Sequence, residues 1–242
     1  MKAARLSILL IFLSVNSSSA EWRFEAYGGK FYPGRSDLTI YRPRAGDNLT
    51  YHDLEWEDRS WEHPIYYGYR ISWFLPGSLR NGIELEFIHP KIHSDPSSRL
   101  LATGTLARQP VSGVRVLGDH IELFDISHGL NFLLINWAYR RAWRMSGPVG
   151  PGKSYLVFRS GLGPCICHTE SLIDNVFMEH YELGGLGVQA ALGAVIPIIG
   201  RLYLPLEYKI TYAWLRNLDI YGGKARLNAA GFHLILAAGI WL

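Results

Sequence analysis

The sequence predicts an all-β protein, a closed antiparallel transmembrane β-barrel of about eight strands, with residues 21–242 as its single domain. In the runs Arg201 to Trp214 and Gly231 to Leu242, apolar side chains occupy every second position. A period of two indicates a β-strand. Both runs exceed the usual strand of about 5 or 6 residues and reach the length that crosses a bilayer at a tilt, about 9 to 11 residues. Aromatic residues make up 13% of the chain, and membrane barrels place them in girdles at both interfaces.

The first residues predict export. Lys2 and Arg5 precede an apolar stretch, Leu6 to Val15, and a polar, small-residue region that ends at Ala20. This arrangement is typical of a secretory signal peptide, here residues 1–20. The apolar stretch is shorter than the roughly 20 residues of a membrane helix. Because only helices and closed barrels satisfy their backbone groups in lipid, we expect a barrel in the outer membrane of a Gram-negative bacterium.

The first three strands are predicted from their alternation. The mature chain starts on a strand from Trp22, and a long polar loop is expected from Pro33 to Pro64. The second strand runs from about Ile65 to Leu75 and the third from Gly82 to about His93, with a tight turn at residues 76–78 between them. Long connections on one side and short ones on the other are typical of outer-membrane barrels, with long outer loops and short periplasmic turns.

A second long loop, Ser94 to about His120, separates these strands from the remaining five. Their predicted ranges are Phe132 to Arg141, Ser154 to Gly163, Tyr181 to Ile196, Arg201 to Trp214 and Gly231 to Leu242. A loop is expected around Arg216 to Lys224 between the last two strands. The connections between the predicted strands therefore alternate between short turns and long loops up to the end of the chain.

The inward positions of these strands carry charges of both signs. They are Arg23, Glu25, Arg70, Glu84, Glu86, Arg159, Glu207 and Lys209. An eight-stranded barrel has a narrow lumen that side chains fill, and buried charges must pair. We therefore expect a plugged polar lumen and no open pore. A soluble β-sandwich would also alternate, but with shorter strands and a loosely solvated second face.

The net charge of +3 is weak and forms no dense basic patch, which argues against a nucleic-acid partner. With the N-terminus in the periplasm, eight of the nine histidines fall in outer loops or at outer strand ends, and His233 alone lies within a strand. Neutral imidazole is a common metal ligand and general base. A rim metal or acid/base site is predicted from His89, His93, His128 and His168, beside Glu86, Asp125 and Glu179. The chain has no HExxH spacing, so an ordinary collection of polar loop residues remains the alternative.

The two cysteines are Cys165 and Cys167. A disulfide is the default in an oxidising compartment, although a one-residue spacing would strain it. Metal ligation together with His168 is the alternative. There is no Gly-x-Ser-x-Gly motif and no His-x-Ser at a strand end, which argues against a serine-type acyl hydrolase.

Several motifs, taken together, resemble one family. They are Trp56-Glu57 to Trp61-Glu62, Pro64 to Arg70, Gly82 to Lys91, His128 to Leu134, and Glu207-Tyr208-Lys209. This series resembles small outer-membrane barrels known as lipid A oxidases, over roughly Tyr51 to Leu242. The resemblance implies oxygen-dependent oxidation of the proximal glucosamine of lipid A to 2-aminogluconate at the outer leaflet.

Residues in the matching motifs suggest roles. His89, His128 and Asn131 are the catalytic candidates, and His89, His93, His128 and His168 are the candidate ligands of a divalent metal. Lys91 and Arg99 are the candidates for holding the lipid phosphates. The chain departs from the family at an inserted segment, Leu101 to Gly118, and at its Cys-x-Cys.

Two interpretations stay open, because fold does not settle function. As an enzyme, the protein would act on lipid A or lipopolysaccharide, and a monomer is expected. As a non-enzymatic barrel, it would support the envelope or bind a surface partner. A lipid A deacylase is a third, disfavoured option, because the nucleophile motif is missing.

Overall fold

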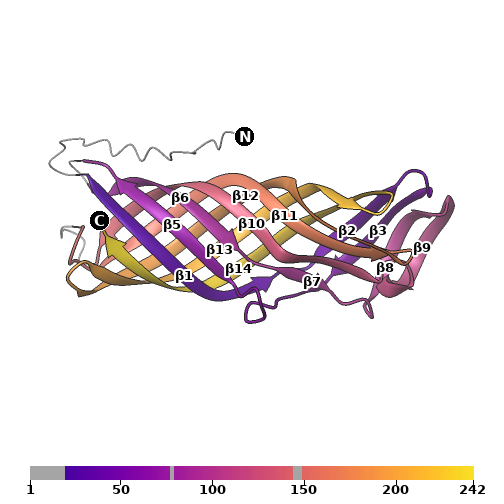
Figure 1. Cartoon of the computed structure of the whole chain (residues 1–242), viewed down its shortest axis with the longest axis horizontal. Helices are drawn as coiled ribbons and strands as arrows, with labels where there is room; N and C mark the ends of the chain where they lie inside the picture. The colour runs from indigo at the N-terminus through magenta and orange to yellow at the C-terminus, as the bar shows by residue number, and fades with distance from the viewer. Residues whose placement is uncertain (1–19, 77–78, 144–148) are drawn as a thin grey trace, which may run out of the picture.

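The fold is an all-β structure built around a ring of eight antiparallel strands. The computed structural model describes residues 20–242 except 77–78 and 144–148; the predicted signal peptide lies outside them apart from Ala20. The strands of the ring are β1 (Glu21–Pro33), β5 (Tyr67–Phe74), β6 (Asn81–His89), β10 (Leu123–Ala142), β11 (Tyr155–Ile173), β12 (Val176–Ile199), β13 (Leu202–Ile220) and β14 (Gly223–Trp241). Each pairs with its neighbour in this order, and β1 pairs with β14, which closes the ring (Figure 1).

The eight ring strands include all eight strands predicted from the alternation of side chains. Helical structure in the described residues is limited to one 3-10 turn, Leu117–Asp119. Within that same part of the chain, no helix is long and apolar enough to cross a membrane.

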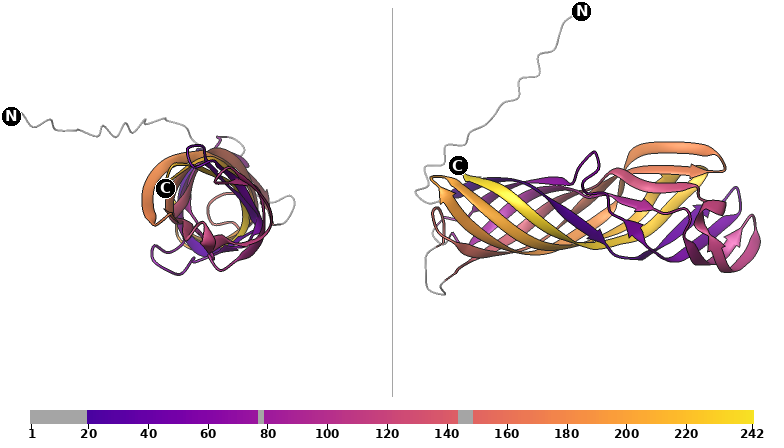
Figure 2. Two further views of the ribbon diagram at one scale, coloured as in Figure 1. Left: turned by 90° about the vertical axis from the view of Figure 1, so that its right-hand side faces the viewer. Right: turned by 90° about the horizontal axis from the view of Figure 1, so that it is seen from below.

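Beyond one end of the ring, further strands form an extension. They are β2 (Ser36–Arg42), β3 (Asp47–Leu54), β4 (Trp56–Glu57), β7 (Ile92–Ser94), β8 (Arg99–Leu106) and β9 (Gln109–Val116). The far part of β14 pairs with β2, and β3, β8 and β9 follow in order, at the end opposite the C-terminus (Figures 1 and 2).

The extension corrects two predictions. The segments 33–64 and 94–120, expected as long loops, contain β2 to β4 and β7 to β9. Leu38, Ile40 and Leu49 alternate with polar residues and are fully buried in the core of the extension. These strands are short and rich in turn residues, so their alternation is weak in the sequence.

The prediction of a loop at residues 216–224 is also wrong. Strands β13 and β14 continue through it and are joined by the tight turn Tyr221–Gly222. The β11–β12 connection is likewise a two-residue turn, in which Asp174 and Asn175 have φ values of 54° and 60°. Two φ values of this kind match the primed turns that suit the twist of a hairpin. At this end of the ring, the strands are thus long and are joined by tight turns where long loops were expected.

The outward face of the ring is a continuous apolar belt. Its exposed members include Trp22, Phe24, Tyr69, Ile71, Ile83, Leu85, Leu133, Ile135, Trp137, Phe158, Leu162, Leu186, Leu192, Leu206, Tyr208, Ile210, Leu234 and Leu236. On β13, Leu206 and Tyr208 are exposed, whereas Glu207 and Lys209 between them are buried. The ring therefore turns its apolar side chains outward and its charges inward.

The eight predicted lumen charges lie inside the ring and contact one another. Arg70 is central, because its guanidinium reaches Glu25 at 2.6 Å and Glu207 at 2.9 Å and also pairs with Glu86. Arg159 lies 2.8 Å from Glu84. The four cations Arg23, Arg70, Arg159 and Lys209 face the four carboxylates Glu25, Glu84, Glu86 and Glu207, so the formal charge of the set is zero.

Two apolar clusters enclose this charged layer. Phe74, Tyr155, Tyr203 and Trp241 form one at the end where β1 begins. The larger one fills the extension and the adjacent part of the ring, and includes Leu38, Tyr51, Trp56, Phe124 and Phe132. The interior is thus filled by side chains in three successive layers.

We predict that Glu86→Gln strongly destabilises the ring. The Glu86 carboxylate accepts hydrogen bonds from Arg70, Lys209, Tyr27, Asn136 and Gln189. Loss of its charge leaves two buried cations undercompensated, which costs about 3–5 kcal/mol. Urea unfolding of the purified protein measures the loss. Glu55→Gln is the control, since its exposed pair with Arg35 contributes little; equal effects of the two changes would contradict the role of the network.

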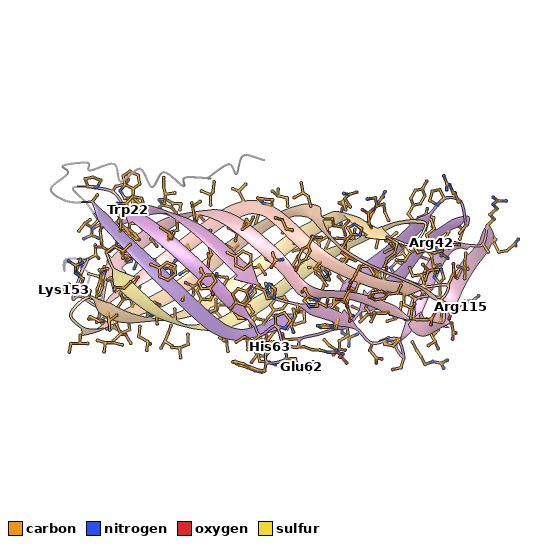
Figure 3. The ribbon with its side chains drawn as sticks, viewed as in Figure 1. Trp22, Arg42, Glu62, His63, Arg115 and Lys153 are labelled. Atoms are coloured by element: carbon orange, nitrogen blue, oxygen red, sulfur yellow. The ribbon has the colours of Figure 1, made fainter. Side chains whose placement is uncertain are left out.

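A second charged group holds the extension to the ring. Arg42 at the end of β2 pairs with Asp47 and with Asp174 of the β11–β12 turn, and His120 Nε2 lies 3.1 Å from Arg42 Nη2 and 3.5 Å from Asp47. Figure 3 shows Arg42 far from Trp22, at the end that also holds Arg115. His120 accepts from Arg42 only while its Nε2 is unprotonated. Burial, and next the Arg42 charge, lower the pKa of His120 below its ordinary value.

We predict that the extension loosens as pH falls from about 7 to 5. Because the pKa of His120 is lower in the folded state, the unfolded segment binds a proton first, and stability falls as pH drops through the ordinary histidine value of about 6.5. The Asp47 carboxyl, whose pKa is also lowered, loses its contribution only at more acidic pH. Hydrogen exchange of the β2–β3 amides measures the effect. His120→Gln should flatten this pH dependence, and an unchanged slope would refute the assignment.

Candidate functional site

A bulge in β10 creates the candidate site. The pairing of β10 with β11 passes from Ile126 opposite Thr169 to Leu130 opposite Cys167, so residues 127–129 stand opposite His168 alone. A bulge of this kind re-aims side chains and is common beside functional sites. The extra residues are Ser127, His128 and Gly129.

Gly129 is required at this bulge. Its φ is 111°, which favours glycine. A Cβ there would lie 2.3 Å from Asn131 Oδ1 and 2.4 Å from His89 Nδ1. These two side chains are hydrogen-bonded to each other at 2.7 Å. The glycine therefore lets the backbone of β10 pack directly against the His89–Asn131 pair.

The site faces outward from the wall of the ring. On β11, His168 and Glu170 are an even number of residues from the exposed Leu162. Because alternate residues of a strand lie on one face, all three point outward. Asp125 lies opposite Glu170, so it shares their face. Asn131 lies two residues from the exposed Leu133, and His89 lies four residues from the exposed Leu85, so each shares the outward face of its strand. The predicted rim of loops is therefore an outward-facing patch of strand residues.

The centre of the patch is a set of two imidazoles and one carboxylate. His128 Nδ1 lies 3.1 Å and His168 Nδ1 3.5 Å from Glu170 Oε1, and one ligand atom from each residue lies within 4.8 Å of the others. Ser127 Oγ donates to Glu170 and lies 3.1 Å from His128 Nδ1. Two histidines and a carboxylate are a common ligand set for a divalent metal, including non-haem iron. Burial, and next His128, lower the pKa of His168, which favours the neutral imidazole that binds metal.

Two further predicted histidines are held nearby by polar partners. His89 Nδ1 bonds to Asn131, and His93 Nδ1 lies 2.9 Å from Asp125 Oδ2. In both rings Nε2 is buried without a hydrogen-bond partner. An oxygen that fixes one ring nitrogen and leaves the other available is the arrangement around metal-binding histidines. His89 and His93 do not, however, join the set of His128, His168 and Glu170, so the predicted four-histidine site is divided.

The remaining predicted site residues lie elsewhere. Glu179 of β12 is opposite Glu170 and borders the patch, whereas Glu86 belongs to the lumen. Lys91 is buried, and its Nζ donates to the Glu62 carbonyl at 3.0 Å; burial lowers its pKa. Figure 3 shows Glu62 on the flank, midway along the structure. Arg99 is exposed at the start of β8, in the extension. Lys91 thus lies two residues from His89 on the same segment and is bonded to Glu62, and Arg99 belongs to the extension.

Sequence reasoning missed two groups. Ser127 enters the patch only through the bulge, whereas Glu170 follows His168 at the two-residue spacing of one strand face. A second cluster joins His180 and Glu182 of β12 to Asp219 of β13, with His180 Nε2 3.0 Å from Asp219. Because residues 216–224 were expected to form a loop, no partner for His180 could be inferred there.

The cysteines take no part in the patch. Cys165 and Cys167 are free, fully buried and inward, where they lie against Gly187 and Gly184 of β12. His168 is next to Cys167 in the chain and so faces the opposite side of the strand. Their joint ligation of a metal, considered from the sequence, is therefore wrong, and the thiols instead pack as small apolar groups.

Comparison with known proteins gives a structural likeness but no family. No family model matches the chain, and no curated protein matches it. Among solved structures, the chain is similar to Neisserial surface protein A, with 7% sequence identity and a TM-score of 0.39, over 91% of this chain and 96% of that chain.

We predict that the patch binds one divalent metal ion. Glu170→Gln and His168→Ala each remove a ligand, so each should weaken binding more than about tenfold. Calorimetric titration of the purified protein with Zn²⁺ or Fe²⁺ measures the affinity. His52→Ala is the matched control, because His52 also pairs with a carboxylate, Asp37, but lies on β3. Wild-type affinity in the Glu170→Gln protein would rule out this ligand set.

Proposed function

We propose that the protein is a monomeric outer-membrane barrel of a Gram-negative bacterium, exported by the signal peptide at residues 1–20. The support is the ring itself. Its apolar belt faces outward all round, its charges are paired inside, and the β1–β14 pairing leaves no open edge in the ring. Lipid requires both features, since unsatisfied backbone groups and unpaired charges are costly there. A closed, filled ring also needs no second copy to complete it.

One observation supports an enzymatic role. The set of His128, His168 and Glu170 faces outward on β10 and β11, level with a part of β12 where the exposed residues alternate between apolar and polar, as Tyr181 and Glu179 do. At that level a barrel meets the polar headgroups of the outer leaflet. A polar cluster on this wall thus faces a lipid headgroup, whereas a site for a soluble substrate would be expected in the mouth of the barrel.

We infer that the reaction is the oxidation of the proximal glucosamine of lipid A to 2-aminogluconate. The step requires a free anomeric hydroxyl, so the substrate is lipid A whose 1-phosphate has already been removed. Its hemiacetal gives two electrons and two protons to O₂, which becomes H₂O₂, and water opens the resulting lactone to the acid. A divalent metal bound by His128, His168 and Glu170 would supply Lewis acidity and a path for electrons. The sugar would thereby gain one oxygen atom.

The protein residues supply orientation and a base. Asn131 fixes one ring nitrogen of His89, and we assign His89 the role of the base that accepts the proton from the sugar hydroxyl. Ser127 orients the Glu170 carboxylate by donating to it. Arg99, exposed on β8, is available to a phosphate group, whereas Lys91 is occupied by Glu62.

A second candidate, lipid A deacylation, is supported by Ser127. The fold places its hydroxyl beside an imidazole and a carboxylate, although no nucleophile motif marks it in the sequence. However, Ser127 and His128 both contact the same oxygen, Glu170 Oε1. In a nucleophilic triad the imidazole stands between the hydroxyl and the carboxylate. Deacylation therefore ranks second.

Mass spectrometry of lipid A from cells with and without the protein tests these alternatives. We expect a product heavier by one oxygen, and loss of this product in His128→Ala and His168→Ala cells. His180→Ala, in the second histidine cluster, should retain it. Loss of an acyl chain would instead indicate deacylation through Ser127, and unchanged lipid A would indicate a barrel that acts by binding or by supporting the envelope.

A further inference from the structure

The outward wall also carries an apolar groove directly beside the candidate site. Its volume is about 440 Å³, and its walls include Tyr69, Leu85, Phe87, Leu133 and Ile135. Arg70 and Glu86 border it through their strands, but their side chains belong to the buried charges of the lumen. The groove is therefore an apolar hollow in the belt.

One residue of β11 makes the floor of this groove low. Gly163 faces the interior of the ring, and a Cβ there would lie 1.9 Å from the Leu133 carbonyl oxygen, so β10 and β11 approach closely. The next residue, Pro164, is exposed on the outward face, where its short ring follows Leu162. Large outward side chains surround this proline, which leaves room for a narrow apolar ligand.

The groove leads along its strands to the candidate site. On β6 and β10, His89 and Asn131 each lie two residues from a groove residue, Phe87 and Leu133, which is about 7 Å along a strand. On β11, His168 is four residues from Pro164, about 13 Å. A molecule with an apolar end in the groove would thus have its polar end at the histidines.

We propose that this groove is an acyl-chain subsite, which holds one fatty acyl chain of the lipid whose sugar lies at His128, His168 and Glu170. This assignment rests on the proposed function and specifies its substrate: an acylated sugar lipid, bound from within the membrane by both of its parts. The volume falls in the range of ligand sites, about 300–1,000 Å³. The groove is continuous with the lipid-facing belt, so a chain can enter sideways without leaving an apolar environment.

A comparable hollow of about 380 Å³ on the far wall provides a control. It is lined by Leu192, Ala194, Leu206 and Leu234, on strands that bring no outward-facing histidine cluster beside it within the described residues. Ala194 is a small, half-buried residue in that hollow, as Pro164 is a small residue in the groove. Filling either position with phenylalanine changes the belt in the same way, but only one change blocks the groove.

The test is native mass spectrometry of the purified full chain in detergent with hexaacylated lipid A. In Pro164→Phe, lipid A retention should weaken about tenfold, as expected if about two methylenes leave the groove. Ala194→Phe should bind like the wild type. Ile135→Trp, at an exposed wall position, is the second groove variant if Pro164→Phe does not fold.

Retention in both groove variants at the wild-type level would overturn the subsite, and so would an equal loss in Ala194→Phe. The result is separate from the chemistry. If lipid A binds through the groove but gains no oxygen in cells, the subsite stands and the proposed oxidation fails. If oxidation occurs at the wild-type rate in both groove variants, the oxidation stands and the subsite fails.

Discussion

The structure depends on the pairing of four cations with four carboxylates inside the ring. Each of these side chains is buried, and removing an ion from water costs several kcal/mol unless its partners are well placed. Arg70 meets this demand by contacting Glu25, Glu86 and Glu207 from three different strands. The network therefore also fixes how β1, β5, β6 and β13 are arranged. An apolar lumen would give these strands two similar faces, whereas the charges specify which face is inside.

The extension follows the opposite rule. There the interior is apolar, with Leu38, Tyr51 and Trp56 buried, and the exposed positions carry polar residues such as Arg44, Asp53 and Glu55. This is the pattern of a protein in water. The same long strands, β10 to β14, pass through both regions, so the change of pattern along them marks the outer boundary of the belt. The histidine patch lies at that boundary.

The sequence was sufficient for the ring, because each ring strand has a long, regular alternation and a polar inward face. Strands such as β2 and β8 were missed because they are short and flanked by turn residues. For the site, His89, His128, Asn131 and His168 were found by residue type, but their outward direction was not. The gathering of the site also depends on the bulge at residues 127–129, which brings His128 opposite His168. The bulge includes Gly129, which packs against His89, a contact between distant parts of the chain.

The filled lumen determines where chemistry can take place. A narrow ring whose interior is occupied by Arg70 and its partners has no room for a substrate, so a catalytic or binding site must lie at the mouth or on the outer wall. On the wall, the requirements of the belt permit polar side chains only near its boundary, since charge facing lipid at mid-depth is costly. The position of His128, His168 and Glu170 satisfies both conditions. An apolar groove that ends at the same boundary then gives a lipid, rather than a soluble sugar, two points of attachment.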